Sequence, residues 1–265
     1  MQQDYKIIET ERLILKPFSS LTEEQKEETI KSWDNPFNAR YNAEPNSRKS
    51  VEDLMERPEP TFTNIDKSLD SYYDTMFFRV AYDKITGKLI GSCRFGKYPE
   101  SKTMKKWDFG YNVLLRHWSK GYGTEMVKKI IEIARDEGAK YIRGGADNDN
   151  FGSYHGMIKN GFKYIGIDKD KDFEFQLKLS RTPSKEDCEK EWKKHIKRYI
   201  KRKSKNGLVF GPRKYEDLQE IKRLIKKMVE EIQKGGDEDL LVQKYNEKVE
   251  AILAKYNQVE TCEKD

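Results

Sequence analysis

The sequence has few cysteines and no long apolar run. Its three cysteines, Cys93, Cys188 and Cys262, lie far apart in 265 residues, so neither a disulfide framework nor a zinc site is indicated. No apolar stretch approaches the roughly 18–20 residues that a membrane helix needs. The first residues, Met1 to Asp4, lack the basic and apolar pattern of a signal peptide. These absences predict a soluble, cytoplasmic protein without a metal.

Charge is abundant but nearly balanced. Charged residues make up 37% of the chain, against 35% for hydrophobic residues, and the formal net charge is +6. The basic excess is concentrated between Lys193 and Lys205. Such a segment is either the solvated face of a helix or a contact for RNA or an acidic partner. The sequence leaves both interpretations open.

The first 180 residues alternate between strand and helix signals. Thr22 to Gln25 resembles a capping box at a helix start, after which prolines break the chain up to residue 60. Apolar periodicity predicts helices over 124–134 and 151–160. Alternation and turn residues predict seven strands, over 7–18, 77–82, 88–95, 107–115, 140–146, 164–167 and 173–179. This order predicts an α/β (α+β) fold.

Strand signals stop after Thr182 to Ser184, and helical spacing follows. We therefore predict a domain over 1–180 and a helical extension over 181–265, with about three helices. Its second helix carries apolar residues at alternating spacings of three and four, a narrow seam. Gly235 and Gly236 separate this helix from the third, so the two are expected to form an antiparallel hairpin. The seam residues are Leu218, Ile221, Ile225, Met228 and Ile232.

The segment from Trp107 to Glu125 reads as a strand, a turn with two glycines, and a helix start. The first N–H groups of a helix lack intrahelical partners and carry positive partial charge. The turn from Ser119 to Thr124 is therefore a candidate cradle for a pyrophosphate. It matches neither the GxGxxG pattern nor the P-loop pattern. Taken alone, it fits a tight connection equally well.

Several ordered motifs extend this segment. They are Thr10 to Phe18 (TERLILKPF), Gly110-Tyr111, Trp118 to Glu125 (WSKGYGTE), Asn150 to Ser153 (NFGS) and Lys159 to Phe162 (KNGF). Over about residues 7–180 the chain resembles the GCN5-related N-acetyltransferase (GNAT) superfamily, and within it the branch of ribosomal-protein N-terminal acetyltransferases (RimJ/RimL-like).

This resemblance implies a mixed sheet, flanked by helices, that splays between its fourth and fifth strands and binds acetyl-CoA there. The pantetheine arm would pair with the fourth strand, and Asn150 would bind the same arm. The phosphates would lie on the turn after the fourth strand. The implied cofactor-binding positions are Val113, Leu114, Leu115, Ser119, Lys120, Gly121, Tyr122, Gly123, Thr124 and Asn150. Since all precede residue 180, acetyl-CoA binding is not expected to need the extension.

Acetyl transfer needs an unprotonated amine, and α-amines with a pKa near 7.7–8 meet this more easily than lysines. The resemblance implies Asp108 as general base, and Ser153 as proton donor to the departing thiolate. Many family members have, at the position of Met157, a tyrosine that acts as the general acid.

The predicted function is acetyl-CoA-dependent transfer to an amine of a protein N-terminus or a small molecule. One alternative is an acetyltransferase for aminoglycosides or polyamines. The other is a non-catalytic CoA-binding module whose helical extension contacts RNA, a protein partner or a second copy. The sequence does not choose among these acceptors and partners.

Overall fold

The computed structural model describes residues 7–33, 52–53, 55–56, 76–97, 106–147, 150–167, 172–179, 190, 192–193 and 215–257. The basic stretch beyond Lys193 and most of the proline-rich segment before residue 76 lie outside the described residues.

The core of the fold is an eight-stranded sheet in the order β1-β2-β3-β4-β5-β6-β8-β7. Only the β5–β6 pair is parallel, and the other neighbours are antiparallel. The strands are β1 (Ile8–Glu9), β2 (Leu13–Lys16), β3 (Met76–Asp83), β4 (Leu89–Lys97), β5 (Lys106–Val113), β6 (Tyr141–Ala146), β7 (Lys163–Ile167) and β8 (Phe173–Lys178). The predicted mixed α/β fold is thereby confirmed. The strand expected over 7–18 is instead two short antiparallel strands.

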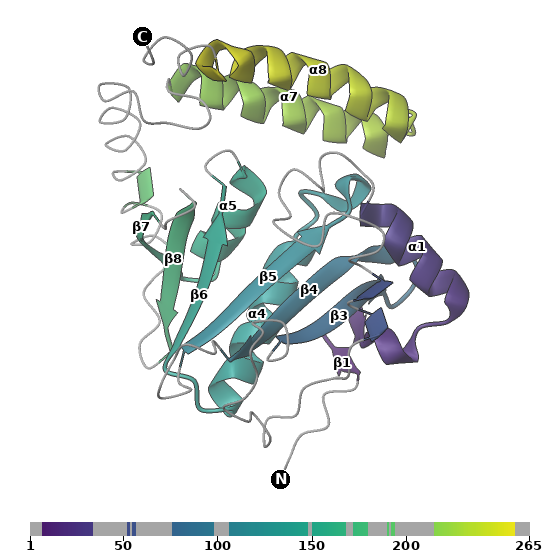
Figure 1. The fold of residues 1–265 in the computed structure, drawn as a ribbon, viewed down its shortest axis with the longest axis vertical. Coiled ribbons are helices and arrows are strands. Elements are labelled where there is room, and N and C mark those ends of the chain that lie inside the picture. The colour runs from purple at the N-terminus through teal and green to yellow at the C-terminus, as the bar shows by residue number, and fades with distance from the viewer. Residues whose placement is uncertain are drawn as a thin grey trace.

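Helices cover the sheet and extend past one of its ends (Figure 1). They are α1 (Glu23–Trp33), α4 (Tyr122–Asp136), α5 (Phe151–Lys159), α7 (Tyr215–Gln233) and α8 (Glu238–Asn257), with short 3-10 turns η1 (Phe18–Ser20) and η3 (Leu115–His117). The capping box forms reciprocally before α1: Gln25 N donates to Thr22 Oγ1 over 3.2 Å, and Thr22 N donates to Gln25 Oε1 over 3.3 Å.

Two apolar clusters lie against the sheet. The larger joins strand residues such as Leu13, Leu15 and Trp107 to Met126 and Ile130 of α4 and to α5. The smaller gathers around η1 and is formed by Phe18, Leu21, Val80, Tyr82 and Leu89. Leu13 and Leu15 of β2 are fully buried in the larger core, and they alternate with the partly buried Ile14 and Lys16.

Strands β5 and β6 part along the sheet. They pair only over three positions, ending where Asp108 faces Arg143, although β5 continues to Val113 and β6 to Ala146. Beyond Asp108, β5 remains paired on its other side with β4. The sheet thus opens a wedge between the predicted fourth strand (107–115) and fifth strand (140–146), as the family resemblance implies.

The C-terminal helices form the expected antiparallel hairpin. Tyr245 of α8 donates to Glu231 of α7 over 2.8 Å near one end, and Lys255 of α8 lies 3.4 Å from Asp217 of α7 near the other. The hairpin lies across the ends of β5 and α5 (Figure 1). Its seam belongs to the same apolar cluster as α4 and the sheet, so the extension and the body share one core.

Candidate functional site

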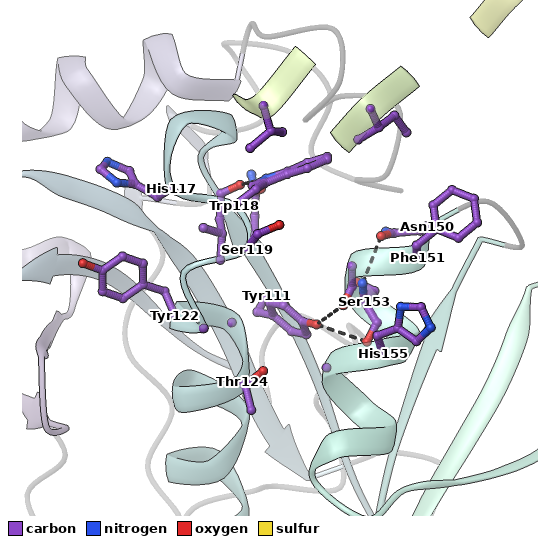
Figure 2. A pocket seen from close by; sticks show the side chains of 18 of the residues that line it. Tyr111, His117, Trp118, Ser119, Tyr122, Thr124, Asn150, Phe151, Ser153 and His155 are labelled. Atoms are coloured by element: carbon purple, nitrogen blue, oxygen red, sulfur yellow. Dashed lines mark hydrogen bonds between the residues drawn. The ribbon is translucent and has the colours of Figure 1, made fainter. Parts of the chain in front are cut away.

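A cavity of about 390 Å³ opens where β5 and β6 part (Figure 2). Its walls are the end of β5, the turn into α4, the first turns of α5 and one face of α7. The lining residues are Tyr111, Asn112, Val113, His117, Trp118, Ser119, Gly121, Tyr122, Gly123, Thr124, Asn150, Phe151, Gly152, Ser153, His155, Gly156, Lys159, Lys222, Ile225, Lys226 and Val229.

The start of α4 borders this cavity and has no side-chain cap. Gly121, the residue that caps the helix, has φ 85° and no side chain that could accept from the first-turn N–H groups. Ser119, just before it, also has a positive φ of 62°. A helix start of this kind offers N–H donors and positive partial charge to an anion. The turn predicted as a phosphate cradle is therefore a helix start of this kind, and its binding of phosphate stays a prediction.

The N-terminal motif fastens this turn from outside. The Glu125 carboxylate accepts from Thr10 Oγ1 over 2.5 Å, from Arg12 N over 2.8 Å and from Arg12 Nε over 2.7 Å. Arg12 also donates to the Lys120 carbonyl over 3.0 Å and lies over the Tyr122 ring at 4.3 Å. The TERL and GYGTE motifs thus contact each other through Thr10 and Arg12, for which no role is predicted from the sequence. The only sequence signal for this contact is that both motifs occur in the same chain.

Tyr111 stands at the base of the cavity between α4 and α5 (Figure 2). Its hydroxyl donates to the Ser153 carbonyl over 3.1 Å. Burial raises the pKa of Tyr111 to about 12, with the Ser153 hydrogen bond opposing it, so the hydroxyl keeps its proton at neutral pH. A Cβ at Gly123 would lie 2.6 Å from the Tyr111 ring, and one at Gly156 2.5 Å from its hydroxyl. Both helices therefore approach the ring through a glycine.

The start of α5 faces the start of α4 across the cavity. Asn150 caps α5, because its Oδ1 accepts from Ser153 N over 3.1 Å. This hydrogen bond holds the first turn of α5, and both residues line the cavity. Ser153 is thus placed at the helix start by its backbone, while its side chain lines the same space as Asn112 and Thr124.

Two aromatic residues of the β5–α4 connection close a third side. Trp118 Nε1 donates to the Val113 carbonyl, 2.5 Å away, so the indole is fixed against the end of β5. His117 packs edge-on against Tyr122. Burial, followed by the charges of Lys120 and Arg116, lowers the pKa of His117 to about 4. His117 is therefore neutral at pH 7 and adds no charge to the cavity.

Helix α7 supplies the remaining wall, so residues beyond 180 also line the cavity. Lys222, Ile225, Lys226 and Val229 line the cavity. Their spacing of three and four residues defines a second stripe on α7, which shares Ile225 with the seam. The sequence indicates this second face only through Val229, an apolar residue of the helix that is not part of the seam. No known motif includes the residues of this face.

Most predicted site residues meet in this cavity. Those that line it are Val113, Ser119, Gly121, Tyr122, Gly123, Thr124, Asn150 and Ser153. Leu114, Leu115 and Lys120 are not among the lining residues. Leu114 N donates to Ile90 O over 2.8 Å, Leu115 is fully buried in η3, and the Lys120 carbonyl is held by Arg12. The edge of β5 that β6 leaves unpaired lines the cavity instead through Tyr111, Asn112 and Val113.

Asp108 lies just outside the cavity, at the throat of the wedge. It is the last β5 residue that pairs with β6, and it is partly buried. Because side chains alternate along a strand, Asp108 faces the opposite side of the sheet from Phe109 and Tyr111. That side is reached from the face opposite to α4 and α5. Asp108 therefore lies where β5 and β6 separate, on the face of the sheet opposite to α4 and α5.

Two further features of the described residues bear on ligands. No group of three His, Cys, Asp or Glu residues within the described ranges could hold a metal ion. No described helix is both long and apolar enough to span a bilayer.

Comparisons with known proteins agree on the family domain. A family model described as an acetyltransferase (GNAT) domain matches residues 12–163. No curated protein matches the chain. Among solved structures, a GNAT-family acetyltransferase from Bacillus anthracis is similar with a TM-score of 0.51 at 14% identity, covering 66% of this chain and 99% of that one. A Vibrio cholerae protein named as a ribosomal-protein-serine acetyltransferase gives 0.50 at 16% identity, over 67% and 99%. At these identities the likeness establishes the fold.

Proposed function

The chain belongs to the GNAT acetyltransferase family, and we propose that it transfers the acetyl group of acetyl-CoA, bound in the cavity between α4, α5 and α7, to the α-amine of a peptide. As a family member it is an N-acetyltransferase with acetyl-CoA as acetyl donor. The site is assigned from one observation: the wedge between β5 and β6 opens beside the start of α4, where no side chain caps the helix.

The residues of the cavity fit acetyl-CoA. The N–H groups from Ser119 to Thr124 suit a pyrophosphate, because they are unpaired backbone donors at a helix start. The edge of β5 at Asn112 and Val113 suits the amide-bearing pantetheine arm, in the way that a sheet edge pairs an extended peptide. Ser153 and Asn150 would then lie along the same arm, toward the base of the wedge.

The chemistry of the transfer assigns two side chains. The amine nitrogen forms a bond to the thioester carbonyl carbon, the carbon–sulfur bond breaks, and the sulfur departs as a thiolate. The amine must lose a proton, for which Asp108 at the throat of the wedge is the proposed acceptor, directly or through one water. The thiolate takes a proton from the Ser153 hydroxyl, which solvent then replenishes, or from solvent itself.

An α-amine acceptor is favoured by two observations. The motifs of the chain resemble those of the RimJ/RimL-like branch, in TERLILKPF and in WSKGYGTE. In addition, a much larger fraction of an α-amine than of a lysine is unprotonated at pH 7, so deprotonation adds less to the acetylation barrier. Asp108 faces the side of the sheet opposite to the cofactor cavity, where such an amine could approach the thioester.

The test is release of the CoA thiol from acetyl-CoA with matched acceptors. Lysine-free peptides with a free N-terminus should support release, and the same peptides with an acetylated N-terminus should not. A polyamine and an aminoglycoside complete the panel. Preferential use of either would replace the peptide assignment. Tight acetyl-CoA binding without turnover on any acceptor would instead favour the non-catalytic module.

A further inference from the structure

Helix α7 is fixed to the body along the stripe that faces the cavity. Gln233 Nε2 donates to the Trp118 carbonyl over 3.0 Å, and Arg116 Nη2 lies 2.8 Å from Glu238 at the start of α8. Ile225 and Val229 are buried on the same side of the helix. The hairpin therefore has a defined register against the cofactor cavity, and its polar residues on this stripe have defined places.

Two lysines of the stripe stand at the cavity. Lys222 is half-buried, and its ammonium lies 5.8 Å from the ring centroid of Phe151, the first residue of α5. Lys226 is exposed and lies one turn further along α7. Its ion pair with Glu230, at 3.7 Å, joins two solvent-exposed side chains and is therefore weak. Both side chains are long enough to reach a ligand that lies across the cavity.

The charge of the cavity has one sign. Three of the residues that line it are lysines, namely Lys159, Lys222 and Lys226, and none of its described lining residues is acidic. The starts of α4 and α5 add positive partial charge on the facing walls. Glu125, the acidic residue in the first turn of α4, is held by Arg12 and does not line the cavity. A ligand with several negative charges suits this space.

We propose that Lys222 and Lys226 bind the phosphate groups of acetyl-CoA, so that α7 of the C-terminal extension forms the second half of the cofactor site. This inference rests on the proposed acetyl-CoA site. The backbone of the α4 turn holds phosphate from one side, and the two ammonium groups hold it from the other. The motif residues before 180 therefore make only part of the binding surface, and the extension contributes side chains of its own.

The direct test is the dissociation constant of acetyl-CoA, measured by calorimetry, for the parent and for K222Q/K226Q. The matched control is R223Q/K227Q, which removes the same charge from exposed positions on the same helix that do not line the cavity. We expect K222Q/K226Q to bind at least about fivefold more weakly, because partly exposed charge pairs each contribute modestly, and the control to stay within about twofold. Equal losses in both variants, or in neither, would overturn the proposal.

A ligand series separates this inference from the cofactor assignment. Acetyl-pantetheine, which has no phosphate, should bind the parent and K222Q/K226Q equally, whereas dephospho-CoA and CoA should lose affinity in the variant. If the parent does not bind acetyl-CoA, the cofactor site itself is wrong. If the parent binds and the variant loses affinity equally for acetyl-pantetheine, the lysines act on the fold and not on phosphate.

Two further variants keep the test valid if removing Lys222 disturbs its packing on Phe151. K226Q alone changes only an exposed side chain and should still weaken acetyl-CoA binding. K222R/K226R keeps both charges and should restore affinity to near the parent value, since arginine also binds phosphate. A phosphate-binding role would be contradicted if K226Q bound as tightly as the parent and K222R/K226R bound as weakly as K222Q/K226Q.

Discussion

The two walls of the cavity differ in what they are made of. The wall at the starts of α4 and α5 is backbone, shaped by Gly121 and by the Asn150 cap. The wall on α7 is side chain, two lysines beside Ile225 and Val229. Backbone sites require particular residues at fixed spacing and therefore leave a motif in the sequence. A charged helix face requires only a helix in the right place, so it leaves almost none.

The same contrast explains how far the family comparison reaches. The family model ends at residue 163, so it includes the first wall and stops before the second. The largest loss of binding is therefore expected from a change in the backbone wall.

Gly121→Val should abolish acetyl-CoA binding. A β-branched residue is strained at φ 85°, and a Cβ there would approach Arg12 Nη2 at 3.4 Å, so the turn should lose the shape that presents its N–H groups. In a thermal-shift series the parent should gain about 2.7 kcal/mol at 100 times its dissociation constant, and the variant should gain nothing. Gly138→Val, at a positive φ just past the opposite end of α4, is the matched control and should keep the ligand shift. An equal shift of the parent with ATP would refute the cofactor assignment.

Asp108→Asn should lower turnover by roughly 10²–10⁴-fold and leave the acetyl-CoA dissociation constant near the parent value. The residue lies at the throat of the wedge, outside the residues that line the cofactor cavity, so only proton transfer should suffer. Ser153→Ala should cost less, because solvent can protonate a thiolate whose reference pKa is near 8.5. Turnover of Asp108→Asn within a few-fold of the parent would assign the proton transfer to water alone.

Trp192→Ala should destabilise the fold by about 3–5 kcal/mol. The indole is 6% exposed, and its ring centroid lies 4.7 Å from that of Tyr154 and 5.3 Å from those of Phe173 and Phe175. This contact fastens the beginning of the extension to β8 and α5. Urea unfolding measures the loss, and Ile85→Ala, at a side chain that is 94% exposed, should cost less than about 0.5 kcal/mol. If Trp192→Ala also cost less than about 0.5 kcal/mol, the contact of Trp192 with β8 and α5 would not stabilise the fold.

Glu125→Gln should cost about 1–3 kcal/mol at pH 7, through weaker hydrogen bonds to Thr10 and Arg12. Burial alone would raise the pKa of Glu125, but the hydrogen bonds from Thr10 and Arg12 and the charge of Arg12 hold it below its ordinary value of 4.5. A lowered pKa means that the ionised group stabilises the fold above its ordinary pKa, and that this contribution is lost as the pH falls below it.

The stability gap between parent and Glu125→Gln should therefore shrink below about pH 4.5. Urea unfolding at pH 7 and at steps toward pH 3 measures it. Glu132→Gln, at a more exposed ion pair with Lys129 on the same helix, is the control and should change little. A gap that stays constant with pH would show that the carboxylate charge does not hold the turn.

The sequence predicted much of the fold because its signals there are local. The Thr22–Gln25 capping box, the Leu13 and Leu15 alternation and the seam of α7 each depend on neighbours within one turn or strand, and each is present. The wedge came from the family resemblance. What could not be predicted depends on tertiary packing: the break of the first strand at Thr10, the bonds from Arg12 to Glu125, and the placement of α7 over a cavity more than 60 residues earlier in the chain.

Hydrogen exchange of the full chain, with and without acetyl-CoA, tests the central claim most directly. The account predicts that the ligand slows exchange in three separate segments: Ser119 to Met126, Asn150 to Tyr154, and Lys222 to Val229 of α7. Amides around Gly138, past the opposite end of α4, should exchange at an unchanged rate. Protection of the first two segments without α7 would remove the extension from the site, and no protection at the α4 start would contradict the account as a whole.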